Sequence, residues 1–183
     1  MSALFVISSA AAYAYFSDIA ISSGNVLGAG TLDLKLSDED EVISDSLTAS
    51  FGGTLAPGEC AKPSTIKVRN TGSIGGDHVD LLMSNVVNDA GKKANAAIDT
   101  LLEIREFAFD ETSLLEHIDD INNNEAKDLD DLGSEGVKDL ALTDNDIDHT
   151  ISIKICLSPT AGDDIQGDTS TTSLTATLFQ NED

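Results

Sequence analysis

The stretch DINNNEAKDLDDL, which runs from Asp120 to Leu132, holds a candidate set of cation ligands. Oxygen-bearing side chains occupy its positions one, three, five, nine and twelve, and a backbone carbonyl is available at position seven. This spacing is typical of EF-hand-type calcium loops, because a 12-residue turn brings alternate oxygens around a single hard cation. The candidate Ca2+ ligands are Asp120, Asn122, Asn124, Ala126, Asp128 and Asp131.

The details of this loop support two different interpretations, a calcium site and a helix-capping loop. It ends in Asp131 rather than Glu and is followed by the apolar Leu132, which resembles the dockerin variant of the motif. Position six is Glu125, where the sharp turn normally takes glycine. In a chain with 33 acidic residues the spacing can also arise by chance. The alternative is a solvated acidic loop that caps a short helix starting near Asp128, and the sequence leaves both interpretations open.

The remaining residues whose side chains could take part in catalysis or metal binding are few and scattered. Cys60 and Cys156 belong to no CxxC motif or Cys/His cluster, which argues against a structural zinc site. They are either both free or paired, and pairing is usual for two cysteines in an extracellular domain. The histidines His78, His117 and His149 lie far apart in the sequence and form no H-E-x-x-H motif. No G-x-S-x-G motif is present either, so we predict that the protein is not an enzyme.

The charge of the chain limits its partners. The 33 acidic residues face only 10 basic ones, for a net charge of -23 at pH 7. Such a surface repels nucleic-acid phosphates and anionic membranes. Its self-repulsion is screened in concentrated salt, so the composition suits either concentrated salt, as in a halophile, or an environment with abundant divalent cations.

Short segments of alternating apolar and polar residues, separated by Gly, Pro, Asn and Asp, predict an all-β sandwich or jelly roll. In the clearest of them, Ile151, Ile153, Ile155 and Leu157 share an inward face, and Cys156 points outward. Leucines among acidic residues predict one helical insert at about residues 112–140. The predicted strands are 32–36, 47–51, 64–69, 77–87, 101–109, 149–157 and 172–180.

The first 14 residues, MSALFVISSAAAYA, form a short apolar run that ends in an A-x-A pattern. This ending is typical of a signal-peptide cleavage site, although no basic segment precedes the run. The alternative is an ordinary N-terminal strand. No stretch of about 20 apolar residues is present, so we expect contact with the membrane only transiently, through the signal segment.

Three further segments carry a family resemblance. AYFSDIAISSGNVLGAGTLDLKL (14–36), LAPGE with STIKVRNTGS (55–73), and IQGDTSTTSLTATLFQN (165–181) resemble the TasA/camelysin family of secreted fibre-forming proteins. The acidic composition is similar to that of the archaeal, bundling-pilin branch. The resemblance implies a jelly-roll fold and polymerisation by donor-strand complementation, in which an N-terminal strand fills a groove of the next subunit.

The resemblance implies a division of the chain into three parts: a signal remnant or extension (1–14), a donor strand segment (15–28) and a jelly-roll domain (29–183). In the donor segment, alternation puts Tyr13, Tyr15, Ile19 and Ile21 on one face and Phe16, Asp18 and Ala20 on the other. The alternative is an edge strand of its own domain. The donor residues that we select are Tyr15, Phe16, Ile19 and Ile21.

The resulting expectation is an extracellular pilin or matrix-fibre subunit, whose partner is itself in a filament that can bundle laterally. The runner-up is a secreted protease of the camelysin type, an activity that we do not transfer because the chain lacks a zincin motif. A third alternative is a monomeric, calcium-binding surface protein. Apart from calcium, we expect no cofactor.

Overall fold

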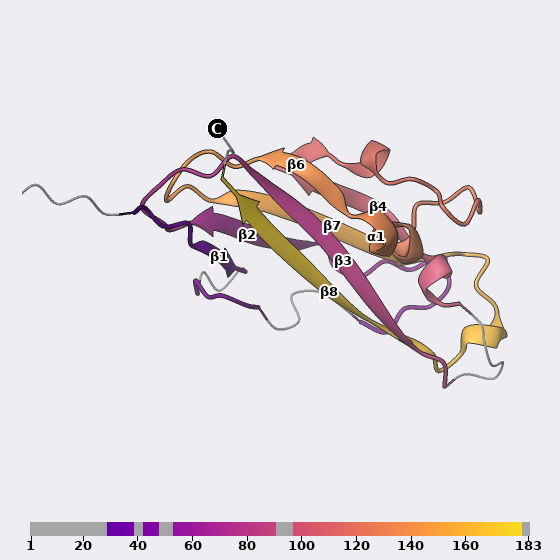
Figure 1. Cartoon of the computed structure of the whole chain (residues 1–183). Coiled ribbons are helices and arrows are strands. Elements are labelled where there is room, and N and C mark those ends of the chain that lie inside the picture. The colour runs from indigo at the N-terminus through magenta and orange to yellow at the C-terminus, as the bar shows by residue number, and fades with distance from the viewer. Residues whose placement is uncertain (1–28, 39–41, 48–52, 91–96, 181–183) are drawn as a thin grey trace, which may run out of the picture.

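The computed structural model describes residues 29–38, 42–47, 53–90 and 97–180, which form a β-sandwich of two antiparallel sheets (Figure 1). One short α-helix, α1 (Leu129–Glu135), lies beside them. Short 3-10 turns are η1 (Asp99–Leu101), η2 (Leu115–His117) and η3 (Asp163–Ile165). The strands are β1 (Leu34–Ser37), β2 (Ser64–Asn70), β3 (His78–Asn88), β4 (Leu102–Phe109), β5 (Thr112–Ser113), β6 (Val137–Ala141), β7 (His149–Leu157) and β8 (Thr169–Phe179).

The larger sheet has the strand order β1-β2-β7-β4-β5. Its central strand, β7, pairs with β2 on one side and β4 on the other. The inward face of β7 is formed by Ile151, Ile153 and Ile155, as the alternation of the sequence predicts. On β2, Ile66 and Val68 also point inward. The alternating apolar residues therefore place one face of this sheet against the core.

The smaller sheet has the order β6-β3-β8. The long strands β3 and β8 pair along their whole length, from His78 opposite Phe179 to Asn88 opposite Thr169. The pairing of β3 with β6 contains a register shift between Val79 and Leu81. Such a bulge adds a residue to one strand and re-aims the side chains near it.

The two sheets enclose one main hydrophobic core. Its fully buried members include Val68, Val79, Leu81, Met83, Phe107 and Ile151. A smaller cluster of Ile98, Leu157, Ala161 and Ile165 lies at one end. Within the described residues, no helix is long and apolar enough to cross a membrane.

The predicted helical insert at 112–140 is wrong in extent. Only Leu129–Glu135 is α-helical, and residues 137–141 form strand β6. The helix ends at Gly136, whose φ of 69° is a conformation that favours glycine. A Cβ atom there would lie 2.4 Å from the Leu81 carbonyl oxygen. Glycine thus allows the chain to leave the helix and begin pairing with β3 at once.

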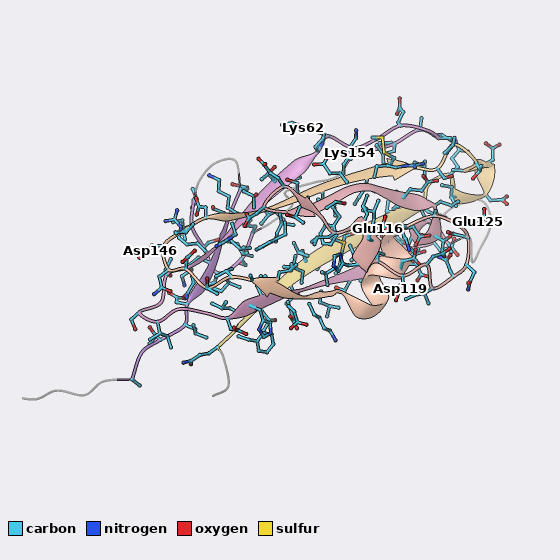
Figure 2. The ribbon with its side chains drawn as sticks, turned by 90° about the horizontal axis from the view of Figure 1, so that it is seen from above. Lys62, Glu116, Asp119, Glu125, Asp146 and Lys154 are labelled. Atoms are coloured by element: carbon cyan, nitrogen blue, oxygen red, sulfur yellow. A yellow bond between two sulfur atoms is a disulfide. The ribbon has the colours of Figure 1, made fainter. Side chains whose placement is uncertain are left out.

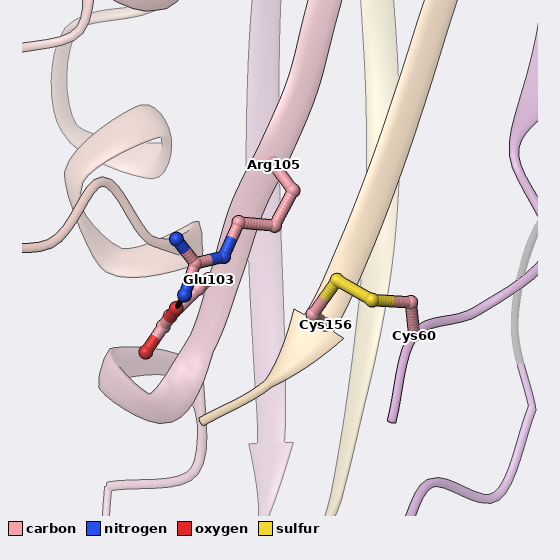
Figure 3. Close-up of a disulfide and its surroundings, with 4 residues drawn as sticks. All are labelled: Cys60, Glu103, Arg105 and Cys156. Atoms are coloured by element: carbon pink, nitrogen blue, oxygen red, sulfur yellow. Dashed lines mark hydrogen bonds and ion pairs between the residues drawn. A yellow bond between two sulfur atoms is a disulfide. The ribbon is translucent and has the colours of Figure 1, made fainter. Parts of the chain in front are cut away.

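Cys60 and Cys156 form a disulfide across the end of the larger sheet (Figure 3). The segment around Cys60 runs beside the end of β7, with Ala61 N–H donating to the Ile155 carbonyl and Leu157 N–H to the Glu59 carbonyl. Cys156 is buried although alternation points it away from the core, because this segment covers it. Figure 3 also shows the nearby ion pair of Arg105 and Glu103 on β4.

Several predicted features lie outside the described residues. These are the signal remnant (1–14), the donor segment (15–28) with Tyr15, Phe16, Ile19 and Ile21, and most of the strand predicted at 47–51. The division of the chain at residues 14 and 28 therefore stays a prediction.

Candidate functional site

Strand β8 lies at the edge of the smaller sheet. One side of it pairs with β3 over all eleven residues. In the part of the chain that the structure describes, no strand pairs with its other side. A strand edge of this kind presents unpaired N–H and C=O groups, which can pair with a strand from another chain.

A groove of about 700 Å³ runs along this edge. One wall is made by seven consecutive residues, Ser170 to Ala176. Because successive side chains of a strand point to opposite faces, contact with all seven means that the backbone edge of β8 faces the groove. The opposite side includes Leu36 from β1, Ile66 from β2, Leu102 from β4, and Ile153 and Ile155 from β7. Leu129 of α1 and residues of the connection between β1 and β2, among them Leu47, Leu55 and Lys62, complete the lining. Ile66, Leu129, Ile153 and Ile155 are buried core residues, so the groove reaches the core between the sheets.

Polar atoms at the beginning of β8 are buried without partners. The Ser170 hydroxyl and both carboxylate oxygens of Asp168 find no hydrogen-bond partner among the described residues. Buried polar atoms are normally paired, with protein or with water. Ser170 lines the groove, so the backbone of a strand inserted there could supply its partner.

This arrangement can bind an extended segment in two ways at once. The edge of β8 offers backbone hydrogen bonds, and the apolar wall offers space for alternate side chains. A strand with one apolar face matches both features. Long-range pairing of this type depends on strand order, so composition and alternation alone do not reveal the groove.

The predicted calcium ligands are gathered in one loop. Asp120 accepts hydrogen bonds from the backbone N–H groups of Asn124 (3.1 Å) and Glu125 (2.9 Å). Asn123 and Glu125 adopt the left-handed conformation, with φ of 59° and 66°. Glu125 therefore takes at position six the conformation that glycine would supply at lower cost.

The end of this loop is a helix cap. Asp128, which is fully buried, accepts hydrogen bonds from Asp130 N–H and Asp131 N–H and so starts α1. Asp131 completes a capping box by accepting from Asp128 N–H. The side-chain amides of Asn122 and Asn124 donate to the second Asp128 oxygen at 3.1 and 2.7 Å. The helix start near Asp128 is thus confirmed, but its cap is buried rather than solvated.

The loop packs against η1, where further negative charge accumulates. Asn124 donates to the Thr100 carbonyl at 3.2 Å. Burial raises the pKa of Asp99, and the charges of Asp130 and Asp128 raise it further. Figure 2 shows acidic side chains of the same region, among them Glu116, Asp119 and Glu125. A cation placed here would lower the repulsion between these carboxylates.

A second cluster with metal-ligand chemistry lies on the outer face of the smaller sheet. His78 and Asp80 lie on β3, and Asp139 lies on β6. One ligand atom from each lies within 4.8 Å of the other two. The hydrogen bond to Asp77 raises the pKa of His78, and the charges of Asp80 and Asp139 add to this effect. This cluster was not predicted, since Asp139 is far from His78 in the sequence and the local signal is limited to the D-H-V-D run of residues 77–80.

Comparison with known proteins places the chain in a family context. A family model described as camelysin metallo-endopeptidase matches residues 2–155. The match therefore includes the N-terminal segment and most of the sandwich. Among curated proteins, no match was found.

Proposed function

The chain belongs to the camelysin family, and we propose that it is a structural subunit of an extracellular filament that polymerises by donor-strand complementation. The observation that carries this proposal is the apolar groove beside the edge of β8 with which no strand of the described residues pairs. The family also includes the fibre-forming TasA proteins, which the N-terminal motifs of this chain resemble. A disulfide is typical of extracellular proteins, which supports the proposed location.

The proposed donor is the segment 15–25 of a neighbouring copy. Tyr15, Ile19 and Ile21 share one face by alternation and would point into the groove, whereas Phe16 would point outward. Added beside β8, this strand would give the smaller sheet the order β6-β3-β8-donor. We expect the completed sandwich to be a jelly roll.

Exchange of this kind is head to tail. Each subunit gives its N-terminal strand to one neighbour and receives a strand from another, so the contact does not close on itself and the product is a filament. The net charge of -23 supports the archaeal, salt-adapted branch of the family. Concentrated salt would screen the repulsion between filaments and so allow lateral bundling.

Substitutions within the proposed donor test this assembly without altering the groove. Ile19→Asp places a charge on the apolar face and should abolish filaments in electron micrographs. The matched control is Ala20→Asp, which places the same charge on the opposite face and should leave filaments intact. Deletion of Tyr15 to Asn25 should leave a folded monomer. Normal filaments from the deletion variant would refute the proposal.

For the loop from Asp120 to Asp131 we propose calcium binding. Its support is the hydrogen-bonded cluster of Asp120, Asn122, Asn124, Asp128 and Asp131 and the left-handed backbone at positions four and six. Ion binding requires the Asn122 and Asn124 carboxamides to turn their oxygens, rather than their nitrogens, toward Asp128. Calorimetry in concentrated monovalent salt should show a binding event that Asp120→Ala and Asp131→Ala abolish. If millimolar calcium gives neither heat nor thermal stabilisation, the loop is only a helix cap.

The competing function is the metallo-endopeptidase activity that the family name carries. The cluster of His78, Asp80 and Asp139 is the feature that favours it, because one imidazole and two carboxylates are a ligand set that zinc accepts. We nevertheless propose a non-catalytic role, since the groove accounts for the N-terminal motif. Cleavage of an unstructured protein such as casein, lost in His78→Asn, would favour the peptidase.

A further inference from the structure

We propose that His78, Asp80 and Asp139 bind a first-row divalent cation of the Zn2+ type, with Asp77 orienting the histidine. This site lies outside the groove.

The hydrogen bond of the imidazole fixes its tautomer. His78 Nδ1 lies 2.8 Å from a carboxylate oxygen of Asp77. A carboxylate only accepts hydrogen bonds, so Nδ1 carries the proton and donates it. In the neutral ring, the lone pair is then on Nε2. A carboxylate that accepts a hydrogen bond from one ring nitrogen, with the other nitrogen free for the metal, is the usual arrangement of a metal-binding histidine.

The free nitrogen faces negative charge. Nε2 lies 3.8 Å from the Asp80 Oδ1 atom and 3.7 Å from the Asp139 Oδ1 atom. These distances are too long for direct hydrogen bonds. They are close to the separation of roughly 3.4 Å that ligand atoms have around a tetrahedral ion with bonds of about 2.0–2.2 Å. The three ligand atoms lie within 4.8 Å of one another, so a rotation of the exposed Asp139 side chain that moves its carboxylate by about an ångström would place all three around one cation.

Two of the three ligands are held by contacts of their side chains, and the third is placed by its backbone. The His78 ring stacks on Phe179 of β8, with centroids 4.8 Å apart and an angle of 13° between the planes. Asp80 Oδ1 accepts a hydrogen bond of 3.0 Å from Asp139 N–H. Asp139 has a φ of 60° and lies where the β3–β6 pairing shifts register. The bulge thus turns Asp139 toward β3.

The ligand set selects the class of cation. Calcium and magnesium prefer all-oxygen sites, whereas an imidazole nitrogen with carboxylates suits zinc and its neighbours in the first row. Three protein ligands leave a position for water or another ligand. Because the ligands come from β3 and β6, the ion would also join these strands across the bulge.

The full-length chain can be titrated with ZnCl2 by calorimetry, at about 1 M KCl so that diffuse attraction to the acidic surface is screened. We expect one equivalent of zinc to bind and to remain bound in millimolar calcium. Of the three histidines, only His78 should show a shifted Nε2 signal in NMR spectra. His78→Asn should weaken zinc binding at least 100-fold, and Asp77→Asn about 10-fold.

Two variants keep the test independent of folding. The Asp139 side chain is 86% exposed, so Asp139→Asn should weaken zinc binding about 10-fold without unfolding the protein. The control His117→Asn removes an exposed histidine from η2 and should change nothing. The proposal is overturned if zinc does not bind, if binding is weak, multiple and unaffected by His78→Asn and Asp139→Asn, or if His117→Asn weakens it equally.

Discussion

At one long edge of the sandwich the chain covers its own core, whereas along β8 the described residues leave core side chains lining a groove. The covered edge is formed by the insert between β4 and β6, which contributes the buried Leu114, Ile118 and Leu132; the buried Leu129 of the same insert also lines the groove. Helix α1 continues along β3 where β6 stops, and its Leu129 carbonyl accepts a hydrogen bond from Asn85. At the β8 edge, no strand of the described residues pairs with the outer side of β8, and apolar side chains line the groove.

The two edges differ in what a second copy of the chain could add to them. The insert side is complete within one chain, and its helix begins with a buried capping box. Under the proposed function, the β8 side would receive another strand that pairs with its backbone and fills its groove. We therefore expect monomer stability to depend mainly on the insert edge, and assembly on the β8 edge.

The largest expected effect on stability comes from the disulfide. Its two cysteines are 96 residues apart in the sequence, and a closed loop of about 100 residues corresponds to roughly 4.7 kcal/mol in the chain-entropy model. The double variant Cys60→Ser/Cys156→Ser should lose about that much free energy of unfolding in a urea titration. Ala61 and Leu55 line the groove near the bridge, so assembly should weaken as well. An unchanged unfolding midpoint would contradict this role.

Truncating one leucine at each edge separates their roles. Leu132 is 2% exposed, and Leu132→Ala should cost about 2–5 kcal/mol of monomer stability. Leu174 lines the groove and is only partly buried, so Leu174→Ala should cost the monomer less but weaken assembly more. Both can be measured in the Ile19→Asp background for stability and in the native background for filament mass. Equal effects of Leu132→Ala and Leu174→Ala on filament mass would contradict the assignment of assembly to the β8 edge.

The smallest expected effect is electrostatic. Arg69 on β2 lies 2.6 Å from Asp148, and its hydrogen bond lowers the pKa of Asp148. A lowered folded-state pKa contributes stability above the unfolded value of about 3.9, and this contribution is lost as the pH falls through the folded-state value. Asp148→Asn should therefore lower the free energy of unfolding at pH 7 by less than about 1 kcal/mol, which a slightly lower melting temperature would show. At pH 2 the substitution should have no effect. A persistent difference at pH 2 would point to another cause.

The sequence predicts much of the sandwich because its strands alternate strictly between two environments. The inward residues of β2 and β7, such as Val68 and Ile153, follow from this alternation. Strand β6 was not predicted, because VKDLA lies in an acidic, leucine-containing stretch that resembles a helix. It forms a strand through its pairing with β3. The six residues of the predicted calcium loop are close in the sequence, so their convergence follows from local spacing.

The groove and the histidine cluster could not be predicted from local patterns. The groove arises because the strand order ends at β8, which no single segment encodes. In the cluster, Asp139 reaches His78 and Asp80 through a bulge between strands that are distant in the chain. The donor residues Tyr15, Phe16, Ile19 and Ile21 came from a family resemblance and stay a prediction.

The most direct test of the central claim is strand binding in trans. The Ile19→Asp variant of the full chain would serve as the monomeric acceptor, and a synthetic peptide of residues 13–28 as the donor, with amide hydrogen exchange as the readout. The account predicts one bound peptide per subunit and slowed exchange at Ser170 to Ala176, whereas a peptide carrying Ile19→Asp should not bind. Absence of binding by the native peptide, or protection elsewhere with the β8 amides unchanged, would contradict it.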